Sequence, residues 1–309
     1  MTLNSPNNTL ISVLGATASG KTSLAIQLAN WLNAPIVSAD SRQFYREMSI
    51  GTAVPSADEL AQAAHYLIQH KSIQDTYTVG DYAKEALTLL DQLFAENPVV
   101  ILVGGSGLYI QALTQGLDEF PEVAPEHKTY VEALWKDRGI EALQKLLREL
   151  DPEYAKTVDL QNPMRLIRAL SVCLSCKQPY SHFLGKAKPA RNFKNIALGI
   201  EGPRTWLHQR INMRVDQMVA SGLFQEAASL YEHRDLNALK TVGYTEVFAY
   251  MNGLISEAQA IEDIKTNTRR YAKRQGTWFR RQPDIHWVTE VEPQLQAISA
   301  LQGLGITPA

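Results

Sequence analysis

The residues from Gly15 to Thr22 read GATASGKT, which fits the spacing G-x-x-x-x-G-K-[ST] of a phosphate-binding loop. Such a loop surrounds an anion with backbone N–H groups and a helix N-terminus. The apolar run 10–14 predicts a buried strand before it, and the apolar spacing across 24–32 predicts a helix after it. We therefore expect this phosphate loop to bind a diphosphate or polyphosphate through Gly15, Ala16, Thr17, Ala18, Ser19, Gly20, Lys21 and Thr22.

Lys21 and Thr22 provide the side-chain chemistry expected of the phosphate loop. The lysine would reach a terminal phosphate, and the threonine hydroxyl would bind Mg²⁺. The loop alone does not identify a kinase. In an ATPase motor an aspartate usually follows a buried strand and holds Mg²⁺, whereas the predicted strand 99–103 runs into Gly104 and Gly105. The motor interpretation is therefore weakened.

Asp40 is the only carboxylate directly at the end of a predicted strand near the phosphate loop, after the short run 35–39. It could hold Mg²⁺ or accept a proton from a nucleophile. Two enzyme classes stay open from these residues: a small-molecule kinase acting on a nucleotide or sugar, and a transferase that uses a diphosphate as leaving group. An RNA-binding protein with a relict phosphate loop is a third, non-enzymatic alternative.

Positive charge is concentrated in two stretches, although the formal net charge of the 309 residues is only −2. Residues 160–200 and 265–282 each contain seven Lys or Arg and no Asp or Glu. The second stretch also contains Tyr271 and Trp278, and unstacked RNA bases stack on aromatic and guanidinium planes. The segment 40–43, Asp-Ser-Arg-Gln, could hydrogen-bond to a base edge. These features favour a nucleic acid partner.

The first 115 residues alternate predicted strands and helices, which is typical of a doubly wound sheet. Helical patterns dominate from about residue 120, and 195–200 reads as one more buried strand. We therefore predict an α/β fold with a parallel sheet and flanking helices, interrupted by a mostly helical insertion. The predicted bounds are 1–119 and 195–309 for the core and 120–194 for the insertion.

Ligands of such sheets bind beyond the carboxyl ends of the strands, where the phosphate loop, Asp40 and the turn 104–107 would meet. An amphipathic helix predicted over 206–221 would add positive charge. Arg210 and Arg214 lie four residues apart on it. Because a guanidinium is a permanently charged, bidentate donor, the pair could clamp a phosphate.

Cysteine usage and hydropathy predict a cytoplasmic protein without membrane contact. Cys173 and Cys176 cannot form a disulfide framework, and their C-x-x-C spacing lacks the second pair that a zinc site needs. The opening MTLNSPNNTL does not resemble a signal peptide, and no apolar run approaches membrane-spanning length. His65 and His70 lie five residues apart, which is no metal-ligand spacing on a helix, and we assign them no role.

The chain resembles the tRNA dimethylallyltransferase family, also called the tRNA isopentenyltransferases, over nearly its whole length. The motifs that carry this resemblance occur in the family's order: GATASGKT, DSRQFY, MSIGTA, VGGSGLY, QNPMRLIRAL, RINMRVDQM, KTVGY and KRQGTWFR. The resemblance implies a P-loop NTPase-like sheet and an enzyme of the bacterial type. It also implies transfer of a dimethylallyl group from dimethylallyl diphosphate to N6 of adenine 37, beside the anticodon of tRNAs that read codons beginning with U.

The resemblance further implies roles for individual residues. Asp40 would be the base that accepts the N6 proton. Thr22 would ligate Mg²⁺, and Mg²⁺ would be the only cofactor. Lys21 and the loop amides would hold the diphosphate. Arg210 would add positive charge at the leaving group, and Arg214 would bind the diphosphate. ATP has no part in this scheme, and we expect a monomer.

Contacts with the anticodon stem-loop are implied along the whole chain. The adenine must leave the stacked loop to reach the sheet's crevice. The expected RNA-contacting residues are Asp40, Ser41, Arg42, Gln43, Ser106, Lys128, Gln161, Asn162, Pro163, Met164, Arg165, Lys240, Gly243, Tyr244, Lys273, Arg274, Gln275, Trp278 and Arg280.

Overall fold

The structure is a computed structural model that describes residues 8–308. The chain divides into two compact units, of which one comprises Met1–Gln115 with Arg191–Ala309 and the other Gly116–Ala190. The smaller unit therefore begins and ends a few residues earlier than the predicted insertion. The opening residues MTLNSPN, on which the signal-peptide expectation partly rests, lie outside the described residues.

The larger unit is built on a six-stranded sheet in the order β3-β2-β4-β1-β5-β6. Every neighbouring pair is parallel, which confirms the predicted fold class. The central strands are continuous apolar runs because helices cover both faces of the sheet. The strands are β1 Thr9–Gly15, β2 Ile36–Ser38, β3 His65–Tyr66, β4 Val99–Gly104, β5 Lys194–Glu201 and β6 Ile285–Thr289.

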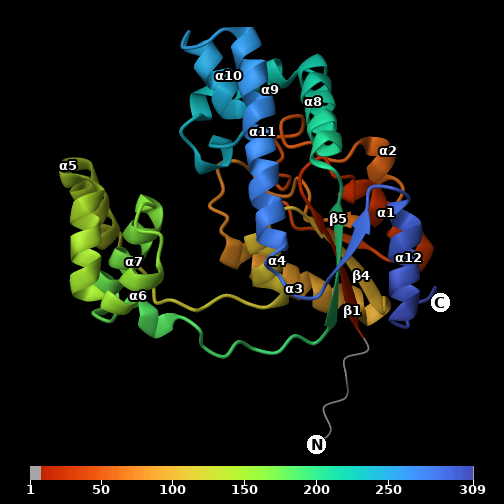
Figure 1. Cartoon of the computed structure of the whole chain (residues 1–309), viewed down its shortest axis with the longest axis horizontal. Helices are drawn as coiled ribbons and strands as arrows, with labels where there is room; N and C mark the ends of the chain where they lie inside the picture. The colour runs from red at the N-terminus through yellow and green to blue at the C-terminus, as the bar shows by residue number, and fades with distance from the viewer. Residues whose placement is uncertain (1–7, 309) are drawn as a thin grey trace, which may run out of the picture. The chain divides into compact units, whose positions relative to one another are not determined.

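Two helical layers bury the faces of this sheet (Figure 1). On one face, Leu24 and Leu28 of α1 pack with Leu301 of α12. On the other face, Tyr82 and Leu90 of α3 pack together with α4 and the end of α11. The helices of this unit are α1 Lys21–Leu32, α2 Ala57–Leu60, α3 Val79–Glu96, α4 Gly107–Thr114, α8 Arg204–Ala220, α9 Leu223–Ser229, α10 Tyr244–Met251, α11 Glu257–Phe279 and α12 Pro293–Gly303, with short 3₁₀ turns η2 Tyr231–His233 and η3 Asn237–Leu239.

A third core lies beyond the carboxyl ends of the strands. Here α8 to α11 pack on the segment that follows β2, with Phe44, Met48 and Tyr244 fully buried between them. Figure 1 shows α8, α10 and α11 at the end toward which β1 and β5 run. This helical group forms the far wall of the crevice in which a doubly wound sheet binds its ligands.

The smaller unit is helical and has its own core around Leu143, Leu147, Leu166 and Leu170. Its elements are α5 Pro125–Leu150, α6 Pro152–Thr157, α7 Pro163–Cys176 and the 3₁₀ turn η1 Tyr180–Phe183. Gly139 leaves helical geometry within α5, with φ 75° and ψ −175°, and so kinks this helix. Prolines start α6 and α7, each after a residue whose side chain caps the helix.

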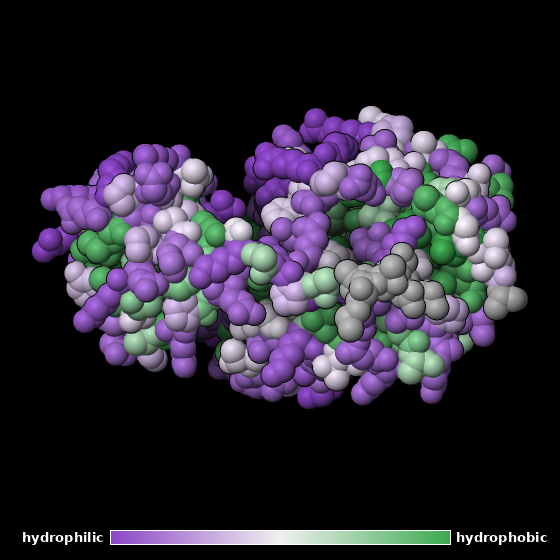
Figure 2. All heavy atoms as spheres, turned by 90° about the horizontal axis from the view of Figure 1, so that it is seen from below, coloured by the Kyte–Doolittle hydropathy of each residue, from purple (hydrophilic) through white to green (hydrophobic). Residues whose placement is uncertain are grey.

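Apolar side chains are largely withdrawn into these cores. Figure 2 shows a mostly hydrophilic surface on one face, with apolar side chains in smaller groups. Within residues 8–308, no helix has the combination of length and apolarity that crossing a membrane requires. Cys173 is buried, Cys176 is half-buried, and both are free thiols.

Candidate active site

The phosphate loop joins β1 to α1 and leaves the helix N-terminus open. Gly20, the residue before α1, has a left-handed φ of 91°, and no side chain in the described part of the chain caps this end. Ala18 also has a positive φ, 63°, which turns the backbone back toward the helix. The free N–H groups of the first turn and the positive end of the helix dipole therefore favour an anion here.

Lys21 folds back over the loop, and its Nζ donates to the carbonyl oxygen of Ala16 at 2.7 Å. Burial and the nearby charge of Arg214 lower the pKa of Lys21 to about 7, although Asp40 opposes the shift. A buried lysine beside another cation needs a negative partner to hold its proton at neutral pH. A bound diphosphate would supply that charge.

Arg210 and Arg214 project from α8 onto the same loop. Arg210 Nε donates to the carbonyl oxygen of Ala18 at 2.7 Å, and Arg214 Nη1 lies 3.3 Å from Thr17 Oγ1. Burial and the neighbouring Arg210 lower the pKa of Arg214. The predicted clamp is thus in contact with the phosphate loop. With Lys21 it places three cationic groups around a cavity of about 260 Å³, which we call the cationic cavity.

Asp40 follows β2 and also lines the cationic cavity. Its Oδ1 accepts hydrogen bonds from the backbone N–H groups of Arg42, at 2.9 Å, and Gln43, at 3.4 Å. The Ser41 N–H donates to Ser106 Oγ at 3.0 Å, so the turn after β4 supports the turn after β2. These bonds fix the carboxyl group at the carboxyl ends of the central strands, as its position after a predicted strand implied.

Asp40 also lines a second cavity of about 490 Å³, here called the outer cavity. The outer cavity extends toward 240–246 and toward α11, and its wall includes Lys240 and Arg274. The two cavities have several lining residues in common, so they meet at these residues. The residues common to both are Thr17, Asp40, Thr52, Ala53, Arg214 and Tyr271.

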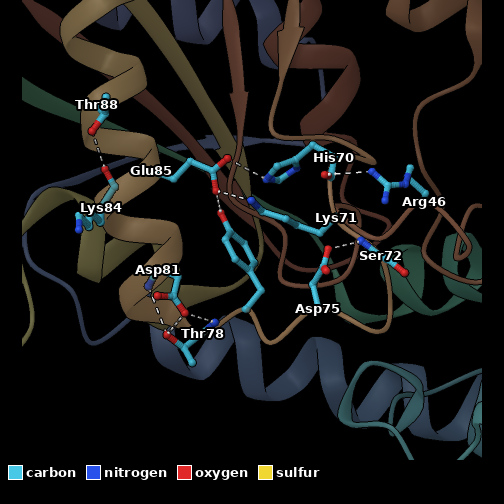
Figure 3. Close-up of polar contacts among 11 residues, drawn as sticks. Arg46, His70, Lys71, Ser72, Asp75, Thr78, Asp81, Lys84, Glu85 and Thr88 are labelled. Carbon is cyan, nitrogen blue, oxygen red and sulfur yellow. Dashed lines mark hydrogen bonds and ion pairs between the residues drawn. The ribbon is translucent and has the colours of Figure 1, made fainter. Parts of the chain in front are cut away.

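A polar cluster outside the cavities holds the segment that follows Asp40. The carbonyl oxygens of Gln43 and Phe44 accept hydrogen bonds from the N–H groups of Gln69 and Lys71, both at 2.9 Å. Figure 3 shows His70 and Lys71 directed at Glu85 of α3, where Lys71 Nζ lies 3.0 Å from Oε2. His70 Nε2 lies 3.4 Å from Oε1, so His70 is part of this support.

The charge of Glu85 is stabilised by this cluster. Burial raises the pKa of Glu85, but hydrogen bonds from Lys71 and from Tyr77 Oη, at 2.8 Å, outweigh burial and leave it below its usual value. Burial lowers the pKa of His70. Glu85 therefore stays an anion that fixes the strip 69–71, and this strip fixes the backbone beside Asp40.

Several residues expected to contact RNA are exposed. In the larger unit Lys240, Lys273, Arg274 and Arg280 are exposed, and Trp278 is 36% exposed. In the smaller unit, taken by itself, four residues are exposed and two are half-buried: Lys128, Gln161, Met164 and Arg165, then Asn162 and Pro163. Asn162 also caps α7, because its side chain accepts from the N–H of Arg165 at 3.3 Å.

Gln275 and Tyr244 were also expected to contact RNA, and in the structure both side chains are buried. Gln275 is only 7% exposed, accepts from Thr17 N–H at 2.8 Å and donates to the carbonyl oxygen of Gly105 at 2.9 Å. It therefore joins the phosphate loop to the turn after β4. Tyr244 is fully buried, and its hydroxyl donates to Glu226 at 2.7 Å.

Three further expected RNA contacts are largely internal. The amide of Gln43 donates to the carbonyl oxygen of Ala53 at 2.8 Å. Ser106 is 9% exposed and donates to Ser41 Oγ at 3.0 Å. Gly243 is buried, with a φ of +101° that only glycine adopts readily. Gln43 nevertheless lines the cationic cavity and Gly243 lines the outer cavity, whereas Ser106 lines neither of them.

Tyr271 and Glu226 belong to the site but were not among the predicted site residues. Tyr271 is one of the residues that line both cavities. Its distance along α11 from the buried Ile264 and Ala272 places it beside the inner face of that helix, a signal the sequence did contain. Glu226 has no such signal, because an acidic residue in a short helix is usually solvated.

Comparison with known proteins agrees with this arrangement. The family model for IPP transferase matches residues 43–282. A tRNA dimethylallyltransferase of Christiangramia forsetii is 53% identical over 281 residues, which cover 91% of this chain and 93% of that one. The tRNA isopentenylpyrophosphate transferase of Bacillus halodurans superposes with a TM-score of 0.71 at 33% identity, covering 96% of both chains.

A eukaryotic dimethylallyltransferase acting on tRNA has the same fold, with a TM-score of 0.80 at 23% identity over 96% of this chain and 77% of that one. The family match spans most of the present chain, and it includes Gln43 at its start and the exposed basic end of α11. The protein is therefore a member of the IPP transferase family.

Proposed function

We propose that the protein transfers a dimethylallyl group from dimethylallyl diphosphate to N6 of adenine 37, adjacent to the anticodon of tRNAs that read codons beginning with U. The observation that carries this proposal is Asp40 at the junction of two cavities, one suited to an anion and the other open toward basic residues. The names of the relatives, tRNA dimethylallyltransferase, support the donor and the acceptor. Diphosphate is the second product.

The chemical difficulty of this reaction lies with the nucleophile. The N6 lone pair of adenine is delocalised into the ring, so the amine attacks poorly. The allylic carbon compensates, since it can carry positive charge while its bond to the diphosphate oxygen breaks. The bond from N6 to that carbon forms, and one N6 proton must leave. Asp40 is placed to accept it, as a general base.

Cationic side chains that line the cationic cavity would stabilise the leaving group. Lys21, Arg210 and Arg214 surround the cationic cavity, so negative charge that develops on the departing diphosphate meets three fixed cations. The α1 N-terminus adds its partial positive charge. Because these groups contact the loop before any ligand arrives, little reorganisation is needed during the reaction.

The residues around the cationic cavity also suit Mg²⁺. Thr22, Ser38 and Asp40 offer oxygen atoms, the ligands that this hard cation prefers. No cluster of three or more His, Cys, Asp or Glu within residues 8–308 could hold a metal ion. A Mg²⁺ ion held by Thr22 would therefore complete its shell with diphosphate oxygens and water, as Mg²⁺ usually does. When bound, it would neutralise part of the diphosphate charge.

A small-molecule kinase is not favoured. The curated relatives are named as dimethylallyl transferases, and the turn after β4 carries glycines where a motor would carry an aspartate. We further propose a monomer that works in the cytoplasm. Two free cysteines suit a reducing compartment.

Asp40→Asn tests the proposal, since the amide oxygen can still accept from the backbone N–H groups of Arg42 and Gln43. The wild type should add one C5H8 unit to an adenosine of unmodified tRNA, measured by mass. Loss of the base should lower this rate by about 10²–10⁴-fold, with tRNA binding retained. Asp58→Asn, an exposed change of the same kind in α2, is the matched control.

Three outcomes would contradict the proposal. An Asp40→Asn variant with the full transfer rate would remove the base assignment. Formation of ADP from ATP with a small acceptor, independent of tRNA, would establish a kinase instead. Tight tRNA binding without any mass gain in the wild type would identify an RNA-binding protein.

A further inference from the structure

Glu226 of α9 joins three segments that are far apart in the chain. Its Oε2 accepts the N–H groups of Ser49 and Ile50 at 2.9 and 2.8 Å. Its Oε1 accepts the N–H of Gly51 at 2.8 Å and the hydroxyl of Tyr244 at 2.7 Å. Two carboxylate oxygens have about four lone-pair directions, so these donors saturate the group.

The segment 49–51, which Glu226 binds, leads directly into the residues that line both cavities. Ile50, held through its N–H, accepts the N–H of Ala53 with its carbonyl oxygen at 3.0 Å. Thr52 and Ala53 line both the cationic and the outer cavity. Ala53 has a φ of +52°, an unfavourable value for a residue with a side chain. Neighbouring contacts must therefore impose this conformation.

Tyr244 packs against the same segment at Gly51. A Cβ placed on Gly51 would come within 2.6 Å of the Tyr244 ring, so the ring lies directly on the glycine. The hydroxyl of that ring shares Glu226 Oε1 with the Gly51 N–H. Gln43, three residues after Asp40, holds the other end of the segment through the carbonyl oxygens of Thr52 and Ala53.

We propose that Glu226 is a positioning residue for prenyl transfer, whose carboxylate fixes Thr52 and Ala53 at the junction of the cationic and outer cavities. This inference rests on the proposed function. The allylic carbon must pass from the diphosphate side to the adenine side at that junction, beside Asp40. A displaced wall there separates the two reacting atoms and admits water, although the cations that hold the diphosphate stay in place.

The predicted defect therefore has a particular form. The hydrogen bonds of the Glu226 side chain go to residues 49–51 and to Tyr244, and none goes to the phosphate loop or to Arg210 and Arg214 of α8, so diphosphate affinity should persist. Transfer to N6 should slow, because a misplacement of the order of 1 Å costs about 10²-fold in rate. Some donor should be hydrolysed instead. In that side reaction the water oxygen bonds to the allylic carbon as the carbon–oxygen bond to diphosphate breaks, giving dimethylallyl alcohol and diphosphate.

Glu226→Gln is the decisive variant, because it keeps the shape but replaces one accepting oxygen by an NH₂ group. Donors that faced that oxygen lose their acceptor. Tyr244→Phe is the milder second variant, which removes one of the four donors and keeps the ring over Gly51. Glu232→Gln, the same change at an exposed residue of η2, is the matched control. Each protein is assayed with Mg²⁺, dimethylallyl diphosphate and unmodified tRNA, well below its melting temperature.

The number of sites is counted by binding of inorganic diphosphate, so that unfolded protein does not enter the rate. Per diphosphate-binding site, Glu226→Gln should lower kcat by about 10–100-fold and raise the share of dimethylallyl alcohol among the products. Its diphosphate Kd should stay within about twofold, the pattern of an interaction used in the transition state. Tyr244→Phe should show the same split with a smaller loss.

A normal kcat per site in Glu226→Gln would overturn the inference, whatever its melting temperature. If Glu226→Gln does not fold, a normal kcat and product ratio in Tyr244→Phe would overturn it. A kcat and a diphosphate affinity that fall together would also do so, because they indicate general disruption. Failure of the wild type to prenylate tRNA would refute the proposed function itself, and the two failures are thereby distinguished.

Discussion

Gly104→Ala should slow prenyl transfer through backbone displacement beside Asp40. Gly104 ends β4, and a Cβ built on it would lie 2.5 Å from the carbonyl oxygen of Ala39 and 2.7 Å from its carbonyl carbon. Both are backbone atoms, so no side chain can rotate to relieve the contact. Ala39 is also tied to β4, because its N–H donates to Val103 at 2.7 Å.

The size of the effect follows from this geometry. Ordinary contact begins near 3.4 Å, so the Ala39 backbone must move by about 0.9 Å. Asp40 is the next residue and moves with it. Since a misplacement of about 1 Å can cost about 10²-fold in rate, we expect kcat to fall by that factor, or about 2.7 kcal/mol of activation free energy. Overpacking should lower the free energy of unfolding by about 1–3 kcal/mol.

Steady-state prenyl transfer to tRNA and thermal unfolding measure the two parts of this prediction. Diphosphate binding should change little, because Lys21 and Arg210 belong to α1 and α8 and not to the turns after β2 and β4. Gly303→Ala is the control, since nothing lies within 4 Å of a Cβ at that position. A folded Gly104→Ala protein with wild-type kcat would refute the reasoning that the close approach of β2 and β4 sets the position of Asp40.

Two further predictions concern the cations and the smaller unit. Because burial lowers the pKa of Lys21 to about 7 and a bound anion would raise it, diphosphate binding should take up a proton above pH 7. Affinity should then fall by up to about tenfold per pH unit above 7. Calorimetry of diphosphate without Mg²⁺, in buffers of different ionisation enthalpy, detects this uptake, and Lys21→Met should lack it. Asp151, only 1% exposed, accepts from the N–H of Tyr154 at 2.9 Å and from the N–H and hydroxyl of Ser181 at 2.7 and 2.9 Å. Asp151→Ala should therefore cost about 2–4 kcal/mol of unfolding free energy in denaturant titration, and an unchanged midpoint would contradict it.

The central strands were predictable because parallel strands buried on both faces are continuous apolar runs. This holds for β1, β4 and β5. The edge strands escaped prediction for the same reason. β3 has only two residues, His65 and Tyr66, and β6 alternates exposed and buried positions, so neither forms such a run. Their pairing depends on neighbours already in place.

The residues of the site also differ in how far along the chain their positions are determined. Lys21 and Asp40 could be located from the chain alone, since a loop and a strand end place them through a few adjacent residues. The hydrogen bonds of Gln275 could not be predicted, because the basic stretch around it suggests RNA, whereas its partners Thr17 and Gly105 follow two other strands and lie 258 and 170 residues away. Glu226 is a second case, because its bond to the N–H of Gly51 spans 175 residues.

Polar residues that bridge distant segments look like surface residues in sequence, because their type reveals polarity but not the partner that buries it. Several residues expected to contact RNA share this property. Gln43 and Gln275 hydrogen-bond to Ala53 and Thr17, which line the cavities, and Tyr244 hydrogen-bonds to Glu226. The groups that react with substrate can thus be predicted from local sequence patterns. The groups that hold them in position can be identified only from the folded structure. A variant at Glu226 or Tyr244 should consequently retain diphosphate binding and lose turnover, whereas a variant at Lys21 should lose both.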